Sequence, residues 1–162
     1  LFPLQRWLPK VFLRWFWSRG RRTSRFSIAL DTYSINAYLD RPIPEIDAVF
    51  RVYNESPFNV HFVATQLRFS NGADEGIWLA VAAEVVVPAR SHQQLALKTQ
   101  LTAEQTAYVR SMIHSHEACE GPHPLCTRFV VRGHLIDPFE EYQFDLSLNG
   151  TLIDHRGPVV KQ

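Results

Sequence analysis

Cysteine is scarce in this sequence, which has only two among its 162 residues. Several disulfides therefore cannot be the main support of the fold, and no Cys-x-x-Cys zinc motif is present. No run of eighteen apolar residues occurs, so the N-terminal arm of about 25 residues cannot span a bilayer by itself. The seven glycines are dispersed, and none opens a phosphate-binding turn between a strand and a helix.

Acidic residues are absent from the first 25 positions, although the formal net charge of the whole chain is only +1. Seven of the 17 basic residues lie in residues 1–25, and all 16 acidic residues come later. This asymmetry predicts a basic arm with its linker, residues 1–25, joined to an acidic folded domain, residues 26–158. Nucleic acid is not an expected partner, because the acidic domain would repel phosphate.

The apolar residues of the arm recur at steps of three and four, which is the period of a helix. Aromatic side chains on one face and cations on another are typical of a helix that lies at the boundary of lipid headgroups and acyl chains. We therefore predict an N-terminal amphipathic helix that binds an anionic membrane surface. Its candidate membrane- or partner-binding residues are Arg6, Trp7, Lys10, Phe12, Arg14, Trp15, Trp17, Arg21 and Arg22.

Other interpretations of the arm stay open. An amphipathic helix also packs on its own domain or on another subunit, and an arginine-rich, acid-free start is also typical of organellar transit peptides. The chain starts at Leu1 rather than Met, so a transmembrane or targeting segment could precede it.

After residue 25 the sequence alternates between apolar and polar residues, the pattern of half-buried β-strands. Short strands separated by Pro, Gly and Asn turn residues predict an all-β fold, an antiparallel β-sandwich of the fibronectin-III or immunoglobulin type. Asn149-Gly150 is expected to form a hairpin turn between the last two strands. The expected strands lie within residues 26–39, 46–53, 58–69, 77–87, 95–101, 129–135, 142–148 and 151–154.

One helix is expected to interrupt the strands, at about residues 102–117. Thr102 and Gln105 stand at the spacing of a capping box, in which each side chain bonds the backbone N–H of the other. Tyr108, Val109, Met112 and Ile113 could then cover the open end of the sandwich.

Three segments of the domain carry a resemblance to a known family: Val49–Phe58 with its asparagine before a proline turn, Val87–Ser91, and Phe129–Leu135 with its internal glycine. Together they resemble the water-stress and hypersensitive-response (WHy) domain, also called the group 2 late embryogenesis abundant domain, over about residues 44–149. The resemblance implies a non-catalytic fibronectin-III-like module that is often held at a membrane and associated with stress protection or binding.

The densest group of chemically active side chains is His114, His116, Cys119, His123 and Cys126. Zinc would accept four of them, but their spacing matches no standard site. A disulfide between Cys119 and Cys126 is the simpler interpretation in an oxidising compartment, and free thiols are the alternative.

Signals for catalysis are weak. No Gly-x-Ser-x-Gly turn is present, and the carboxylate pairs Asp74-Glu75 and Glu140-Glu141 fall in expected turns. We therefore expect no enzyme activity, no cofactor, no metal and no small-molecule substrate.

The leading functional hypothesis is a membrane-tethered module for binding or protection. The alternatives are an accessory subunit of a larger membrane complex, whose arm packs on partner helices, and a sandwich that holds a lipid or another apolar ligand. The expected location is a membrane surface, with the side and the compartment open, and oxidising if the disulfide forms.

Overall fold

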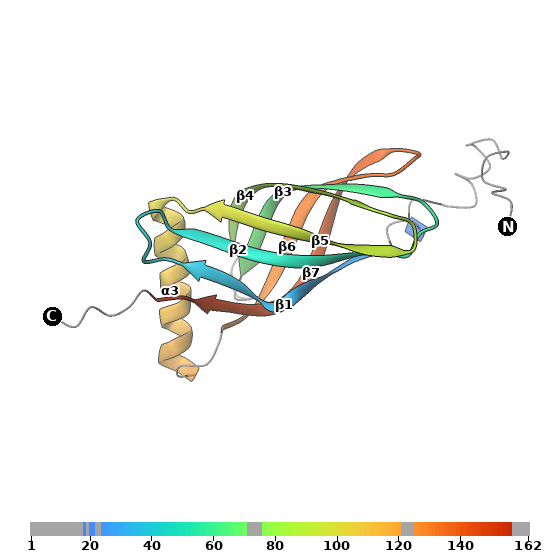
Figure 1. Ribbon diagram of the computed structural model, residues 1–162. Coiled ribbons are helices and arrows are strands. Elements are labelled where there is room, and N and C mark those ends of the chain that lie inside the picture. The colour runs from blue at the N-terminus through green and yellow to red at the C-terminus, as the bar shows by residue number, and fades with distance from the viewer. Residues whose placement is uncertain (1–17, 19, 22–23, 71–75, 121–124, 157–162) are drawn as a thin grey trace, which may run out of the picture.

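The computed structural model describes residues 18, 20–21, 24–70, 76–120 and 125–156 (Figure 1). Strands dominate this part of the chain, and one long helix lies between the fifth and sixth strands. The elements are β1 (Phe26–Tyr38), β2 (Glu45–Asn54), β3 (Val60–Ser70), β4 (Ile77–Val87), β5 (Ser91–Gln100), α3 (Ala103–Glu120), β6 (Leu125–Ile136) and β7 (Glu141–Asp154).

The seven strands follow the order β4-β3-β6-β7-β1-β2-β5 and are folded into two facing layers (Figure 1). One layer holds β4, β3, β6 and β7, and the other holds β1, β2 and β5. The layers are joined where Ser34–Ala37 of β1 pairs with Thr151–Asp154 of β7. On the opposite side the outer strands approach each other, and the Thr99 hydroxyl donates to the Ala80 carbonyl at 2.7 Å.

The prediction of a mainly β fold in sandwich form is confirmed, with one correction. The pairing of β1 with β7 is parallel, so the sheet is not antiparallel throughout. Parallel neighbours far apart in sequence have no local signature, because no turn connects them. The predicted N-terminal amphipathic helix lies outside the described residues, apart from its last few positions.

Buried and more exposed residues alternate along the strands, and the buried ones fill the space between the layers. In β2, for example, Ile46, Ala48, Phe50 and Val52 are buried on one face. The largest side chains of the core are phenylalanines that are inaccessible to solvent: Phe50, Phe62, Phe69 and Phe129. The interior is therefore a packed core.

Helix α3 stands across one end of the sandwich (Figure 1). The predicted capping box at its first turn is confirmed. The Thr102 N–H donates to Gln105 Oε1 at 2.9 Å, and the Gln105 N–H donates to the Thr102 hydroxyl at 3.2 Å. The helix buries Val109, Met112 and Ile113 against the core, which confirms that it covers the open end.

The predicted turn at Asn149-Gly150 is wrong. Both residues lie inside β7, which continues to Asp154, and Gly150 pairs with Thr127 of β6. A Cβ atom at Gly150 would lie 2.2 Å from Leu30 Cδ1, so the glycine provides space for a core leucine instead of a reversal of the chain.

The loops at the other end of the sandwich are organised by Asn54, which is 1% exposed. Its side-chain amide donates to the carbonyls of Phe58, Val87 and Pro88, at 2.7 to 3.1 Å. The basic arm joins the domain at this same end, where the Glu55 N–H donates to the Arg25 carbonyl at 2.8 Å. Helix α3 and the junction at Arg25 are thus at opposite ends of the sandwich (Figure 1).

Candidate functional site

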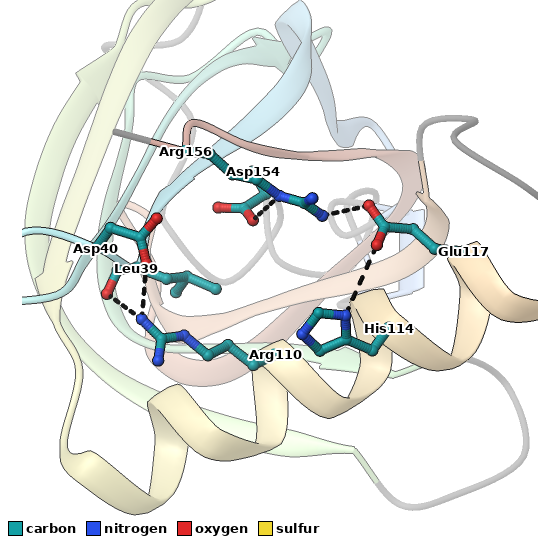
Figure 2. Close-up of polar contacts among 7 residues, drawn as sticks. All are labelled: Leu39, Asp40, Arg110, His114, Glu117, Asp154 and Arg156. Atoms are coloured by element: carbon teal, nitrogen blue, oxygen red, sulfur yellow. Dashed lines mark hydrogen bonds and ion pairs between the residues drawn. The ribbon is translucent and has the colours of Figure 1, made fainter. Parts of the chain in front are cut away.

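A polar groove lies between α3 and the strand ends that it covers, and we call it the α3 groove. Its volume is about 260 Å³. Figure 2 shows that its side chains come from the helix, from the end of β1 and from the end of β7. The lining residues are Asp40, Arg110, Ile113, His114, Asp154 and Arg156.

Arg110 connects the helix to the segment that follows β1. Its Nη2 atom donates to the Leu39 carbonyl at 2.9 Å and to Asp40 Oδ1 at 2.8 Å (Figure 2). The side chain is 47% exposed, so its remaining N–H groups stay accessible to a ligand.

Arg156 connects the end of β7 to the helix. Its Nε atom donates to Asp154 Oδ2 at 3.2 Å, and its Nη2 atom donates to Glu117 (Figure 2). The hydrogen bond to Asp154 and the negative charge of Glu117 raise the pKa of Arg156 above its ordinary value. His114 faces the second oxygen of Glu117, with Nδ1 3.7 Å away.

Asp154 is the least satisfied group of the α3 groove. Its Oδ1 atom is buried and has no hydrogen-bond partner in the described part of the chain, while Oδ2 is held by Arg156. A buried carboxylate oxygen without a donor is unfavourable, and such a group in a native protein calls for an explanation.

The α3 groove was not predicted from the sequence. Arg110, His114 and Glu117 stand at helical spacings of four and three, which is the one local signal that they share a face. Asp40 and Asp154 are brought to that face only by the fold. Of the predicted arm residues, only Arg21 belongs to the described residues, and it is exposed.

Cys119 and Cys126 are free and exposed thiols, so the predicted disulfide is not formed in this structure. Cys119 lies near the end of α3, and Cys126 lies in β6. No group of three or more His, Cys, Asp or Glu residues that could hold a metal occurs among the residues described. His123, a member of the considered zinc set, lies outside them.

A second groove, of about 430 Å³, lies at the seam where the first half of β1 diverges from β7. We call it the seam groove. Its walls are mainly apolar, and its lining residues are Ile28, Ala29, Leu30, Cys126, Leu148, Asn149, Gly150 and Thr151.

None of the helices within the described ranges is long and apolar enough to cross a membrane. No family model and no curated protein matches the chain. The fold is similar to several solved structures at low sequence identity.

A protein from Archaeoglobus fulgidus is 14% identical, with a TM-score of 0.45, and the match covers 77% of this chain and 93% of the other. The solution structure of an Arabidopsis thaliana protein is 10% identical, with a TM-score of 0.46 and coverages of 76% and 80%. A PapD-like domain of human CEP192 is 10% identical, with a TM-score of 0.39 and coverages of 83% and 89%.

Proposed function

We propose that this protein is a non-catalytic binding module, tethered to an anionic membrane surface by its basic aromatic arm. The observation that carries the proposal is the position of the junction between arm and domain. The backbone carbonyl of Arg25, the last residue of the arm, accepts a hydrogen bond from the Glu55 N–H at the end of the sandwich opposite α3 (Figure 1). A membrane bound by residues 1–25 would therefore leave the α3 groove facing away from the lipid.

The charge distribution supports the same arrangement. The arm has seven cations and no acidic residue, whereas the rest of the chain has ten cations and 16 acidic residues. An anionic surface attracts the first part and repels the second, so the domain would stand off the membrane. We also propose that the sandwich is of the fibronectin-III-like type and that the protein has a role in stress protection. The resemblance to the WHy domain supports both points.

Vesicle co-sedimentation of the full chain tests the tether. We expect binding to vesicles that contain phosphatidylserine, weaker binding as salt increases, and little binding to phosphatidylcholine alone. Each basic residue near an anionic surface contributes about 1 kcal/mol. Replacement of Arg6, Lys10, Arg14, Arg21 and Arg22 by glutamine should therefore weaken binding on the order of a hundredfold or more.

A control variant tests whether vesicle binding depends on the cations of the arm or on positive charge anywhere in the protein. Lys98 and Arg128 are exposed cations of the sandwich that lie away from the junction with the arm, and their replacement by glutamine should leave binding unchanged. Equal binding by the arm variant and the natural chain would refute the tether. Absence of binding to every vesicle would favour the accessory-subunit hypothesis, in which the arm packs on partner helices.

The seam groove favours a second candidate function, the binding of a lipid acyl chain. Its volume of about 430 Å³ and its walls of Ile28, Leu30 and Leu148 suit an apolar chain. The two thiols provide the test, because Cys126 lines this groove and Cys119 does not. A bulky maleimide on Cys126 in the C119S variant should block binding of a fluorescent fatty acid, and the same label on Cys119 in C126S should not. Equal binding in both labelled proteins would exclude the seam groove as the site.

A further inference from the structure

The charges around the α3 groove favour a cationic ligand. Three carboxylates, those of Asp40, Glu117 and Asp154, face the guanidinium groups of Arg110 and Arg156 (Figure 2). The lining alone holds two carboxylates and two guanidinium groups, and Glu117 beside it adds one further negative charge. Ile113, which is 7% exposed, adds an apolar wall between these charges.

Asp154 supplies a free acceptor in this setting. Arg156 takes only its Oδ2 atom, and Oδ1 points toward the Asp40 side of the groove (Figure 2). By contrast, Asp145 on the outer face of the sandwich uses both oxygens on one arginine, Arg132. Among the residues described, the buried Oδ1 of Asp154 has no donor, so a donor that enters the groove would satisfy it.

We propose that the α3 groove binds a primary ammonium group carried on an alkyl chain, with Asp154 Oδ1 as its first acceptor and Asp40 as its second. This inference rests on the proposed function, because it names the ligand class of the module's binding site. The alkyl chain would lie along Ile113, which lines the groove beside the two carboxylates.

The geometry favours an ammonium over a guanidinium ligand. A guanidinium binds best when it meets both oxygens of one carboxylate, and Arg156 already holds one oxygen of Asp154. An ammonium is a compact charge with three donors, so it can take the single free oxygen and turn another N–H toward Asp40.

Entry of the ligand requires a small movement of a rim side chain, because Asp154 Oδ1 is covered at rest. Arg110 and Arg156 are 47% and 53% exposed. Ion pairs with such exposure are weak, so one of these arginines can move outward while the backbone of α3 and β7 stays in place.

An NMR titration of the isotopically labelled full chain tests the proposal. The probes are n-butylamine, N-butylguanidine and n-butanol, which share one alkyl chain and differ in the head group. N-acetyl-lysine N-methylamide is the fourth probe and represents a lysine side chain in a polypeptide. We expect both amines to shift the backbone amide signals of Ile113, Asp154 and Arg156, and to bind at least about tenfold more tightly than the guanidine or the alcohol. Tighter binding of the blocked lysine would identify a polypeptide source, and tighter binding of butylamine would identify a free amine.

Conservative variants test which carboxylates bind the ammonium group. In D154N the amide oxygen must face Arg156, so the NH₂ group would occupy the free position and repel the ammonium. We expect amine binding to weaken about tenfold or more in D154N and to weaken less in D40N, whose altered side chain is half-exposed. D145N is the matched control, because it also breaks an arginine–carboxylate pair but lies outside the groove.

The proposal would be overturned by equal binding of butylamine and butanol, by equal binding of butylguanidine, or by unchanged amine affinity in folded D154N and D40N. The amide spectrum of each variant reports its folding in the same experiment. The titration contains no lipid, so loss of vesicle binding would remove the tether without affecting the amine site. Failure of the titration would likewise leave the tether unaffected.

Discussion

Arg132 holds both carboxylate oxygens of Asp145, with Nε 2.9 Å from one oxygen and Nη2 2.8 Å from the other. The two residues are direct partners in the register of β6 and β7. The guanidinium also lies over the ring of Trp78, 4.2 Å from its centroid. Strands β4, β6 and β7 are thereby connected on the outer face of the sandwich, across β3, which lies between β4 and β6.

This pair predicts a pH dependence of stability. The hydrogen bonds from Arg132 lower the pKa of Asp145 below its ordinary value, so the unfolded chain binds a proton at higher pH than the folded chain does. The contribution is fully present above the unfolded value of about 3.9 and is lost as the pH falls through the folded value. Because Asp145 is 40% exposed, we expect a small effect.

Urea unfolding of the natural chain and of D145N at pH 7, 5, 4 and 3 measures the contribution of ionised Asp145 to stability. The natural chain should be the more stable at pH 7 and 5, and the two curves should converge toward pH 3. A stability difference that stays constant over this range would contradict the assignment of the effect to ionised Asp145.

Asn54 should be the most sensitive polar residue of the end at which the arm joins. Its amide donates to three carbonyls, and its Oδ1 accepts from the N–H and the hydroxyl of Ser56, at 3.0 and 2.7 Å. Asn54→Ala would leave several buried groups without partners, each costing about 1–3 kcal/mol when uncompensated. We expect the free energy of unfolding to fall by about 3 kcal/mol.

Asn59→Ala is the control for this change. Asn59 also bonds the β4–β5 turn, through the Ala89 N–H at 3.0 Å, but it is exposed. Its replacement should cost no more than about 0.5 kcal/mol. Equal losses in the two variants, measured by chemical denaturation, would show that burial of the Asn54 network is unimportant.

The strands and the helix could be predicted because their signals are local. The alternation of Ile46, Ala48 and Phe50 reports one buried face, and the Thr102–Gln105 capping box marks the first turn of α3. Asn149-Gly150 misled the prediction because this dipeptide is equally compatible with a tight turn and with a strand position that has no room for a Cβ. Only the position of Leu30, on a strand more than a hundred residues away in sequence, distinguishes the two.

The α3 groove could not be predicted for a related reason. Arg110 and His114 share a helix face that any helical projection would show, but their partners come from distant positions. Asp40 follows β1, and Asp154 ends β7, so the groove exists only because β1 and β7 pair in parallel beneath the helix. Sequence spacing contains no information about that pairing.

Arg90 predicts a stabilising substitution. It has a φ of 53°, in the left-handed region that favours glycine, and its N–H donates to the Ser56 carbonyl at 3.0 Å. Arg90→Gly removes the steric strain and retains the hydrogen bond. We expect a gain of about 0.5 kcal/mol, the release of strain being partly offset by the greater freedom of glycine in the unfolded chain.

Arg90→Ala serves as the comparison, because it removes the same charge but keeps the Cβ atom. It should show no gain in thermal or chemical unfolding. If the alanine variant were as stable as the glycine variant, the gain would come from the loss of charge and not from the backbone.

The reactivity of Cys119 and Cys126 distinguishes free thiols from the disulfide that the sequence suggested. Both are free and exposed in the structure, so we expect two thiols per folded chain to react with a chromogenic disulfide reagent without denaturant. A disulfide across so short a loop would add about 2–3 kcal/mol, and reduction would then lower the melting temperature by several degrees. With free thiols, a reducing agent should leave the melting temperature of the natural chain unchanged, as in C119S and C126S. A fall that is seen in the natural chain and in neither variant would instead establish that Cys119 and Cys126 pair in solution.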